Sequence, residues 1–202
     1  MKKLVFAVVG LMIIITVQAQ KNVSFGPVAG FGHAWMSGGG DNQYKPSGNF
    51  GVQLYYSATE HIGFGADFRY SIEGGEKSFG STETTTRLNY IRIPVQVIYF
   101  FNDYGDRVRP KISIGPSFGF LAGGKQTTGA IETGVKHDYK TLDMGILGNV
   151  GLHARLISET WLTLDLNYYH GLADITETAA STYKNRNFGI NVGLAFGIAR
   201  KR

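Results

Sequence analysis

The sequence contains no cysteine among its 202 residues. This absence excludes a disulfide-stabilised scaffold, thiolate metal sites and catalysis by a thiol. Charged residues are also sparse, at 17% of the chain, and the formal net charge is a modest +5. Apart from the terminal segment 200–202, the chain has no cluster of lysine and arginine interleaved with aromatic residues, so we expect no nucleic-acid partner.

Long apolar runs are missing as well, except at the amino terminus. Lys2 and Lys3 precede the apolar run LVFAVVGLMIIITV, and a small-residue motif ends at Ala19. This order predicts a secretory signal peptide over residues 1–19, cleaved between Ala19 and Gln20. The run is shorter than the ~20 residues that a transmembrane helix needs. Residues 20–202 have no comparable run, so any membrane insertion by this part must use strands.

The chain has instead a repeated alternation of apolar and polar residues. In TWLTLDLNYYHG (160–171), Leu164 and Leu166 fall on one face of an extended strand, and Asp165 and Asn167 fall on the other. No segment has the period of a long amphipathic helix. The alternation predicts eight strands, near residues 23–37, 48–58, 61–73, 86–101, 109–122, 140–157, 160–174 and 187–199.

The connections between these strands alternate in length. Three are short (58–61, 102–107 and 158–160), and four are long and polar (37–49, 73–86, 123–140 and 175–186). In an up-and-down barrel, this alternation places all long loops at one end. Outer-membrane barrels have this arrangement, with short periplasmic turns and longer extracellular loops. We therefore expect residues 20–202 to form an all-β domain, an eight-stranded antiparallel up-and-down transmembrane β-barrel in the outer membrane, with both termini periplasmic.

Glycines indicate which face lines the interior. Gly51, Gly115 and Gly193 are examples of glycines on the face opposite the large apolar residues. Glycine is disfavoured in strands unless the backbone bends or is crowded, and an eight-stranded barrel is only just wide enough for side chains. The glycine-rich polar face therefore fits the lumen, and the apolar face fits lipid. The alternative, a soluble calyx, would reverse the two faces.

The predicted lumen face carries charged and amide side chains that we expect to form a polar network. Its members are Asp67, Arg69, Arg92, Gln96, Lys111, Asp143, Asn149, His153, Arg155, Asp165 and Asn167. Charges in a narrow interior should pair with one another, because an unpaired buried charge is costly. A tight turn at 158–160 would place His153 nearly opposite Asp165, with Arg155 diagonal to it. A catalytic His–Asp pair is the alternative, but a narrow lumen needs paired charges and such ion pairs are often structural, so we favour a structural role.

One segment resembles a known family. In LNYIRIPVQVIYFFNDYGDRVRPKISIGPSFGFLAGG (88–124), the spacing from Tyr90 to Pro94, the short turn and the strand RPKISIGPSFGFL resemble the porin-like outer-membrane β-barrel family. These are small eight-stranded relatives of the outer membrane protein A barrel. The sequence departs from the family at Arg92, where an acidic residue is expected, and at its end. There Phe196 precedes GIARKR, whereas many such barrels end on an aromatic residue read by the barrel-insertion machinery.

The search for chemistry predicts no cofactor and no metal ion, because the five histidines lack metal-ligand spacing. It also predicts no enzymatic activity, because the His–Asp pair would lie in the interior, whereas outer-membrane enzymes usually work at the rim or outer surface. We expect a non-enzymatic barrel with a side-chain-filled lumen, in contact with outer-membrane lipid and lipopolysaccharide. It would act in adhesion, surface interaction or envelope support, through a surface ligand bound by loops 37–49, 73–86, 123–140 and 175–186. The alternatives are a narrow channel for ions or small solutes and an accessory barrel of a secretion apparatus.

Overall fold

The computed structural model describes residues 22–38, 42–79, 82–177 and 182–198. The predicted signal peptide and its cleavage position between Ala19 and Gln20 lie outside these residues. Within them, no helix is long and apolar enough to cross a membrane.

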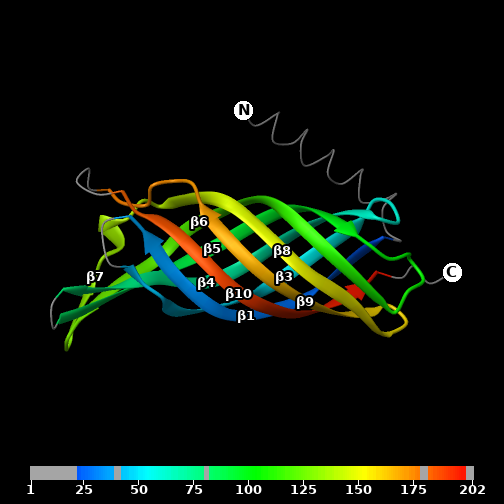
Figure 1. The fold of residues 1–202 in the computed structure, drawn as a ribbon, viewed down its shortest axis with the longest axis horizontal. Helices are drawn as coiled ribbons and strands as arrows, with labels where there is room; N and C mark the ends of the chain where they lie inside the picture. Colours follow the sequence, from blue (N-terminus) through cyan, green and yellow to red (C-terminus); the bar gives the residue numbers. More distant parts are fainter. Residues whose placement is uncertain (1–21, 39–41, 80–81, 178–181, 199–202) are drawn as a thin grey trace.

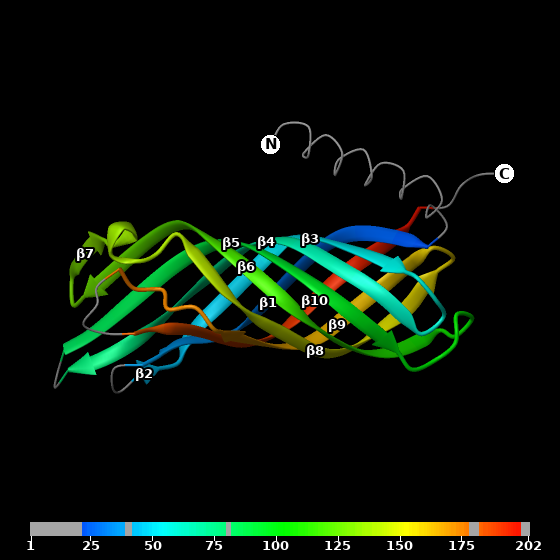
Figure 2. The same ribbon diagram turned by 90° about the horizontal axis from the view of Figure 1, so that it is seen from above.

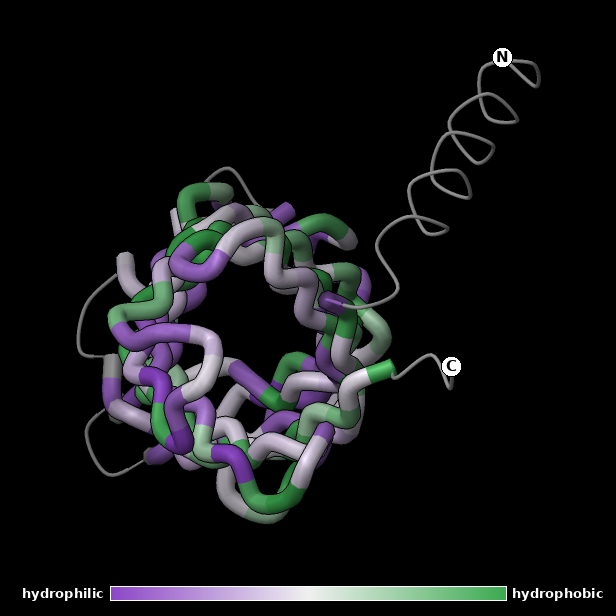
Figure 3. Tube along the Cα trace, turned by 90° about the vertical axis from the view of Figure 1, so that its right-hand side faces the viewer, coloured by the Kyte–Doolittle hydropathy of each residue, from purple (hydrophilic) through white to green (hydrophobic). Residues whose placement is uncertain are grey.

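The fold is a closed antiparallel barrel of eight strands, as predicted (Figures 1 and 2). The barrel strands are β1 (Val23–Ser37), β3 (Lys45–Ser57), β4 (Ile62–Phe79), β5 (Thr82–Phe100), β6 (Val108–Thr128), β8 (Leu142–Ile157), β9 (Thr160–Gly171) and β10 (Lys184–Gly197). Each pairs with the next barrel strand along the chain, and β10 pairs with β1 to close the ring. Seen along its axis, the Cα trace forms a closed ring (Figure 3).

Two ends of the barrel differ in construction. The first, here called the terminal end, carries the short turns and the paired residues Ser24 and Gly197. The opposite end, here called the loop end, carries β2 (Asn42–Gln43), β7 (Ile131–Gly134) and the single-turn 3₁₀ helix η1 (Lys136–Asp138). β2 pairs with β4 and β7 pairs with β6, so both extend the barrel wall beyond the ring (Figure 2).

The alternation along each strand separates two environments. Large apolar side chains such as Phe31, Phe50 and Val150 point outward and are exposed, whereas Asp67 and Lys111 point inward and are buried. The prediction that the apolar face is the outer face is therefore confirmed. An apolar exterior around a polar interior is the arrangement of a membrane barrel and the reverse of a soluble calyx.

Inward-facing glycines allow the wall to curve tightly. A Cβ atom on Gly51 would lie 2.0 Å from the carbonyl oxygen of Phe68, and one on Gly115 would lie 1.9 Å from that of Val95. Both distances are far inside van der Waals contact, so no side chain fits at either position without moving the backbone. The crowding inferred from the sequence is the physical reason for glycine at these two positions.

The predicted limits of the long loops are wrong. β4 ends only at Phe79 and β5 begins at Thr82, so most of the predicted loop 73–86 is strand. β6, β7 and η1 occupy much of the predicted loop 123–140. Range 37–49 contains β2 and the start of β3, and range 175–186 contains the start of β10. These extensions have little apolar alternation, because strand faces that project beyond an apolar belt need no apolar side chains. The sequence pattern therefore ends before the strands do.

Candidate functional site

The interior of the barrel is filled by interacting polar side chains, and one of its buried cations is Arg92 on β5. Arg92 forms a two-bonded ion pair with Glu73 of β4, in which Nη2 lies 2.5 Å from Oε2 and Nε donates to Oε1. The same Nη2 lies 2.5 Å from Asp143 Oδ2 on β8, which also accepts a hydrogen bond from Asn185 of β10 at 2.9 Å. We call these four residues the Arg92 cluster.

Aromatic rings enclose the Arg92 guanidinium. Its Cζ atom lies 3.9 Å from the ring centre of Tyr169 and 5.0 Å from that of Tyr90. Glu73 and Asp143 are 2% and 0% exposed, so two carboxylates share one cation with little access to bulk water. Hydrogen bonds to charged groups are among the strongest in proteins, and the cluster joins four different strands across the lumen.

A second set of charges lies nearer the terminal end. Lys111 Nζ lies 2.9 Å from Asp165 Oδ1, and Arg69 Nη2 lies 2.5 Å from Asp67 Oδ2. The Tyr55 hydroxyl lies 3.4 Å from Lys111 Nζ. All four charged residues are buried, and their formal charges cancel. The ion pairs therefore satisfy the requirement that charges in a narrow interior be paired.

Neutral amide and hydroxyl groups fill the space around these charges. Gln96 Oε1 accepts hydrogen bonds from Ser113, at 2.6 Å, and from Asn149. Gln53 Nε2 donates to Thr163 Oγ1 at 3.1 Å, which links β3 to β9 across the barrel. Such bonds across the lumen replace the water that would otherwise hydrate a polar wall.

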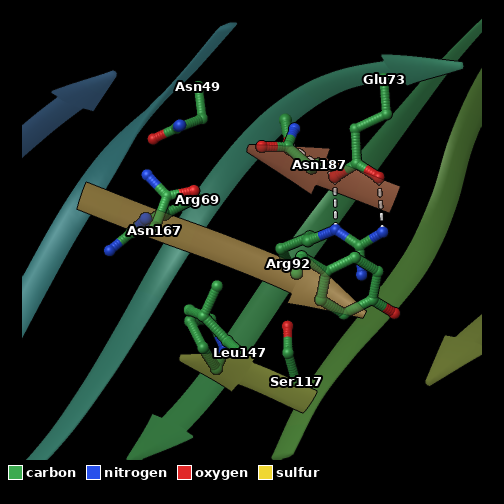
Figure 4. A pocket seen from close by; sticks show the side chains of 11 residues that line it. Asn49, Arg69, Glu73, Arg92, Ser117, Leu147, Asn167 and Asn187 are labelled. Carbon is green, nitrogen blue, oxygen red and sulfur yellow. Dashed lines mark hydrogen bonds and ion pairs between the residues drawn. The ribbon is translucent and has the colours of Figure 1, made fainter. Parts of the chain in front are cut away.

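The remaining central cavity is small, with a volume of about 30 Å³. Figure 4 shows Asn49, Arg69, Arg92 and Asn167 at this cavity, with the two bonds from Arg92 to Glu73. A cavity of this size holds a water molecule. The lumen at this level is therefore packed rather than open.

At the loop end, a small hydrophobic cluster covers the interior. We call it the mouth cap; it consists of Met36, Leu88, Tyr90, Leu121 and Ile175, with Tyr139 and Tyr183 packed against it. Ile175 is fully buried because the segment after β9 folds inward. Its backbone N–H donates to Tyr183 O, and its carbonyl accepts from Lys140 N, both at 2.8 Å. An ion pair of 2.8 Å between Lys140 and Asp174 also fixes this segment.

At the terminal end, aromatic residues surround a wider cavity of about 240 Å³. His153 lies in this region, with its ring centre 4.7 Å from that of Tyr55 and 5.4 Å from that of Phe100. Its neighbours are rings and not a carboxylate. In addition, β8 and β9 pair His153 with Thr163 and Gly151 with Asp165. The expected position of His153 nearly opposite Asp165 is wrong by two residues. The turn is one residue shorter than 158–160, because Ile157 pairs with Thr160, and the irregularity between Arg155 and Ile157 shifts the register by one residue more.

Arg155 also departs from the expected network. Its guanidinium donates to the carbonyl oxygen of Gly105 in a turn and lies 5.2 Å from the Trp161 ring centre. Arg155 therefore contacts residues at the terminal end and does not join the central ion pairs. The other ten predicted members are buried inside the barrel, namely Asp67, Arg69, Arg92, Gln96, Lys111, Asp143, Asn149, His153, Asp165 and Asn167.

Sequence reasoning missed two residues of the Arg92 cluster, Glu73 and Asn185. Glu73 is the boundary of the predicted strand 61–73 and the predicted loop 73–86, and Asn185 falls in the predicted loop 175–186, whereas the structure places them within β4 and β10. The missed signal is that every second residue of a strand faces inward. Glu73 continues the inward series Asp67, Arg69 and Ser71. Asn185 lies an even number of residues before the inward-facing Gly189 and Asn191. Continuing this alternation beyond the predicted strand ends would have identified both residues as facing the lumen.

Two turns at the terminal end bring Glu60, His61 and Asp103 together, with ligand atoms within 4.8 Å of one another. Histidine spacing in the sequence gave no sign of this group. In the structure, Glu60 Oε1 accepts a hydrogen bond from Tyr104 N at 3.1 Å, and His61 Nδ1 lies 3.0 Å from Phe100 O. These bonds connect the β3–β4 turn to the end of β5 and to the β5–β6 turn, which explains the cluster as a contact between turns.

Comparisons with known proteins agree with this geometry. The structure is similar to that of Neisserial surface protein A, with a TM-score of 0.53, 15% sequence identity, and coverage of 87% of this chain and 98% of that one. It is also similar to a major outer membrane protein from Thermus thermophilus, with a TM-score of 0.51, 11% identity, and coverage of 86% of this chain and 98% of that one. No curated protein matches the chain.

These likenesses show the fold, and the sequence itself gives the family. Residues 18–177 match the outer membrane protein beta-barrel domain family. This match spans well over half of the chain, including seven of the eight barrel strands. The chain therefore belongs to the outer membrane β-barrel domain family and is an outer-membrane protein.

Proposed function

We propose that this protein is a non-conducting, non-enzymatic outer-membrane barrel that acts through its loop end at the cell surface. The observation that carries this proposal is the closure of the lumen at two successive levels. The mouth cap covers the loop end, and the Arg92 cluster crosses the interior directly beneath it, with Tyr90 belonging to the one and lying beside Arg92 in the other. A solute would have to displace both.

The energetic cost of opening such a lumen supports this reading over a channel. An ion entering the barrel would have to separate Arg92 from Glu73 or Asp143, and an unpaired charge in a dry interior costs several kcal/mol. It would also have to move Ile175 and its packed neighbours out of the mouth cap. Conducting pores of this fold keep a water-filled interior, which the side chains here occupy.

The proposed orientation places the loop end outside the cell and both termini in the periplasm. The support is the asymmetry of the barrel: short turns gather at the terminal end, whereas β2, β7 and η1 project from the loop end. Outer-membrane barrels have short periplasmic turns and longer extracellular connections. An exposed apolar residue on the projecting part, Ile131 of β7, offers contact area for a surface partner.

The interior also argues for structure over catalysis. His153, the one histidine in the predicted network, is surrounded by aromatic rings, and Asp165 is paired with Lys111. A general base needs a hydrogen-bond path to a reacting group. The mouth cap separates these side chains from the loop end, and the proposed activity therefore belongs to the surface and not to the lumen.

Conductance measurements test this proposal. Folded protein reconstituted into planar bilayers in concentrated KCl should give no discrete conductance steps over the voltage range in which the bilayer is stable. A shift in gel mobility on boiling identifies the folded material used. Regular steps of one size from such samples would contradict the proposal and favour the narrow channel.

A further inference from the structure

Six outward-facing side chains at the loop end form a continuous patch across three neighbouring strands, β1, β10 and β9. The strand register arranges them in two rows, Trp35–Arg186–His170 and His33–Phe188–Tyr168. We call these six residues the rim patch. Phe188 and Tyr168 are exposed, and Trp35 also contacts the Tyr44 ring edge-on, with ring centres 5.0 Å apart.

The rim patch begins where the apolar belt ends. The next row toward the terminal end is Phe31–Ile190–Leu166, which is entirely apolar. Aromatic side chains typically mark the membrane interface, where one part of the ring contacts acyl chains and another contacts headgroups. The rim patch therefore lies at the level at which lipid acyl chains give way to headgroups.

A shallow groove of about 470 Å³ runs over this patch, lined by His33, Trp35, Tyr44, Tyr168 and Phe188. The groove lies on the outside of the barrel, so in the outer membrane its open side faces lipid. Its occupant is therefore a lipid and not a solute. Four aromatic rings and a histidine give it apolar surfaces with polar edges.

Arg186 adds a specific charge at the edge of this groove. Its Nη1 donates to the carbonyl oxygens of Gly171, at 2.5 Å, and Asn185, at 3.0 Å, which fixes the guanidinium, and within the described residues its Nε and Nη2 donate no hydrogen bond. Among the ion pairs formed by the described residues, none includes Arg186. A planar guanidinium with free donors is well suited to a phosphate group.

The patch combines a cation with aromatic rings on one side of the barrel. On the opposite wall, the exposed Arg87 of β5 pairs with Gly74 and Lys125, and no aromatic residue pairs with it. The concentration of a cation, two histidines and three rings on three strands indicates one binding site.

We propose that the rim patch binds one phosphorylated glycolipid of the outer leaflet, with Arg186 holding a phosphate and the aromatic residues contacting the sugar and the first acyl carbons. This inference rests on the proposed orientation, which places the loop end in the outer leaflet. Lipid A, the membrane-embedded part of lipopolysaccharide, has this chemistry: two phosphates on a sugar pair that carries acyl chains.

The test measures lipid binding to the full folded chain in detergent micelles by native mass spectrometry. Bis-phosphorylated lipid A, the same lipid without phosphates, and phosphatidylglycerol are titrated separately. The wild-type protein should retain bis-phosphorylated lipid A in preference to both others. Arg186→Gln should weaken its binding about tenfold, as expected for losing a hydrogen-bonded charge. Arg87→Gln, which removes an exposed arginine of β5, should leave binding unchanged.

Three results would overturn the proposal: unchanged binding to Arg186→Gln, an equal loss in Arg87→Gln, or equal retention of the phosphate-free lipid or phosphatidylglycerol. Heat-dependent gel mobility shows that each variant is folded. Orientation is tested separately, because the chain has no cysteine and accepts a single Ile131→Cys label. An impermeant maleimide should label Ile131→Cys on intact cells. Labelling only after lysis would contradict the proposed orientation, whereas the micelle experiment would still report on the patch.

Discussion

Arg92→Ala should lower the free energy of unfolding by about 3–5 kcal/mol, the largest loss that we expect from one side chain. The substitution leaves Glu73 and Asp143 buried side by side without their shared cation. It also removes the guanidinium that packs on Tyr169. Urea unfolding of protein reconstituted in lipid vesicles, followed by tryptophan fluorescence, measures the change.

The same strand offers a matched control. Arg87 also belongs to β5 but points outward and is exposed, so Arg87→Ala should change the free energy of unfolding by no more than about 0.5 kcal/mol. A triple variant, Arg92→Met with Glu73→Gln and Asp143→Asn, should recover most of the lost stability, because it leaves no unpaired charge. Equal effects of Arg92→Ala and Arg87→Ala would show that the cluster does not stabilise the barrel.

Ile114→Arg should destabilise the barrel by about 2–4 kcal/mol, because Ile114 lies in the middle of the outer apolar face of β6. Ile131→Arg on β7 is the matched control, since the two isoleucines are similarly exposed, at 61% and 71%. β7 projects beyond the ring, so an arginine there meets water and should cost no more than about 0.5 kcal/mol. Equal costs for the two variants in vesicles would contradict the assignment of the belt.

The faces of the strands were predictable from the sequence, because side-chain parity is a local property. Knowing that Leu164 and Asp165 are neighbours in a strand is enough to place them on opposite sides of the wall. The choice of which side is inside followed from glycines such as Gly51 and Gly115, whose backbones have no room for a side chain.

The strand ends were harder to predict, because alternation reports contact with lipid and not the strand itself. Threonine-rich segments such as 82–86 pair as strands beyond the apolar belt without an apolar face. This is why the predicted strand ended at Glu73, although Glu73 completes the Arg92 cluster. The His153–Asp165 prediction failed for a different reason: the β8–β9 turn is one residue shorter than expected, and an irregularity near Arg155 shifts the register by one residue more, without a local sequence pattern that predicts it.

The mouth cap could not be predicted at all. Ile175 lies in a polar segment and is fully buried only because Met36, Leu88 and Leu121, from three distant strands, meet it at the loop end. Such a contact depends on the closed shape of the barrel, which periodicity does not encode.

The central claim, that the apolar face contacts lipid and the polar face lines a filled interior, can be tested with tryptophan fluorescence. The chain has two tryptophans, Trp35 on the outer face and Trp161 packed inside against Tyr55 and Phe100. Two variants each keep one reporter: Trp35→Phe leaves Trp161, and Leu164→Trp in a Trp35→Phe/Trp161→Phe background places the reporter on the outer face. Lipids brominated at several depths quench tryptophans that touch acyl chains. The account predicts strong quenching of Leu164→Trp at one depth and little quenching of Trp161 at any depth, whereas equal or stronger quenching of Trp161 would contradict it.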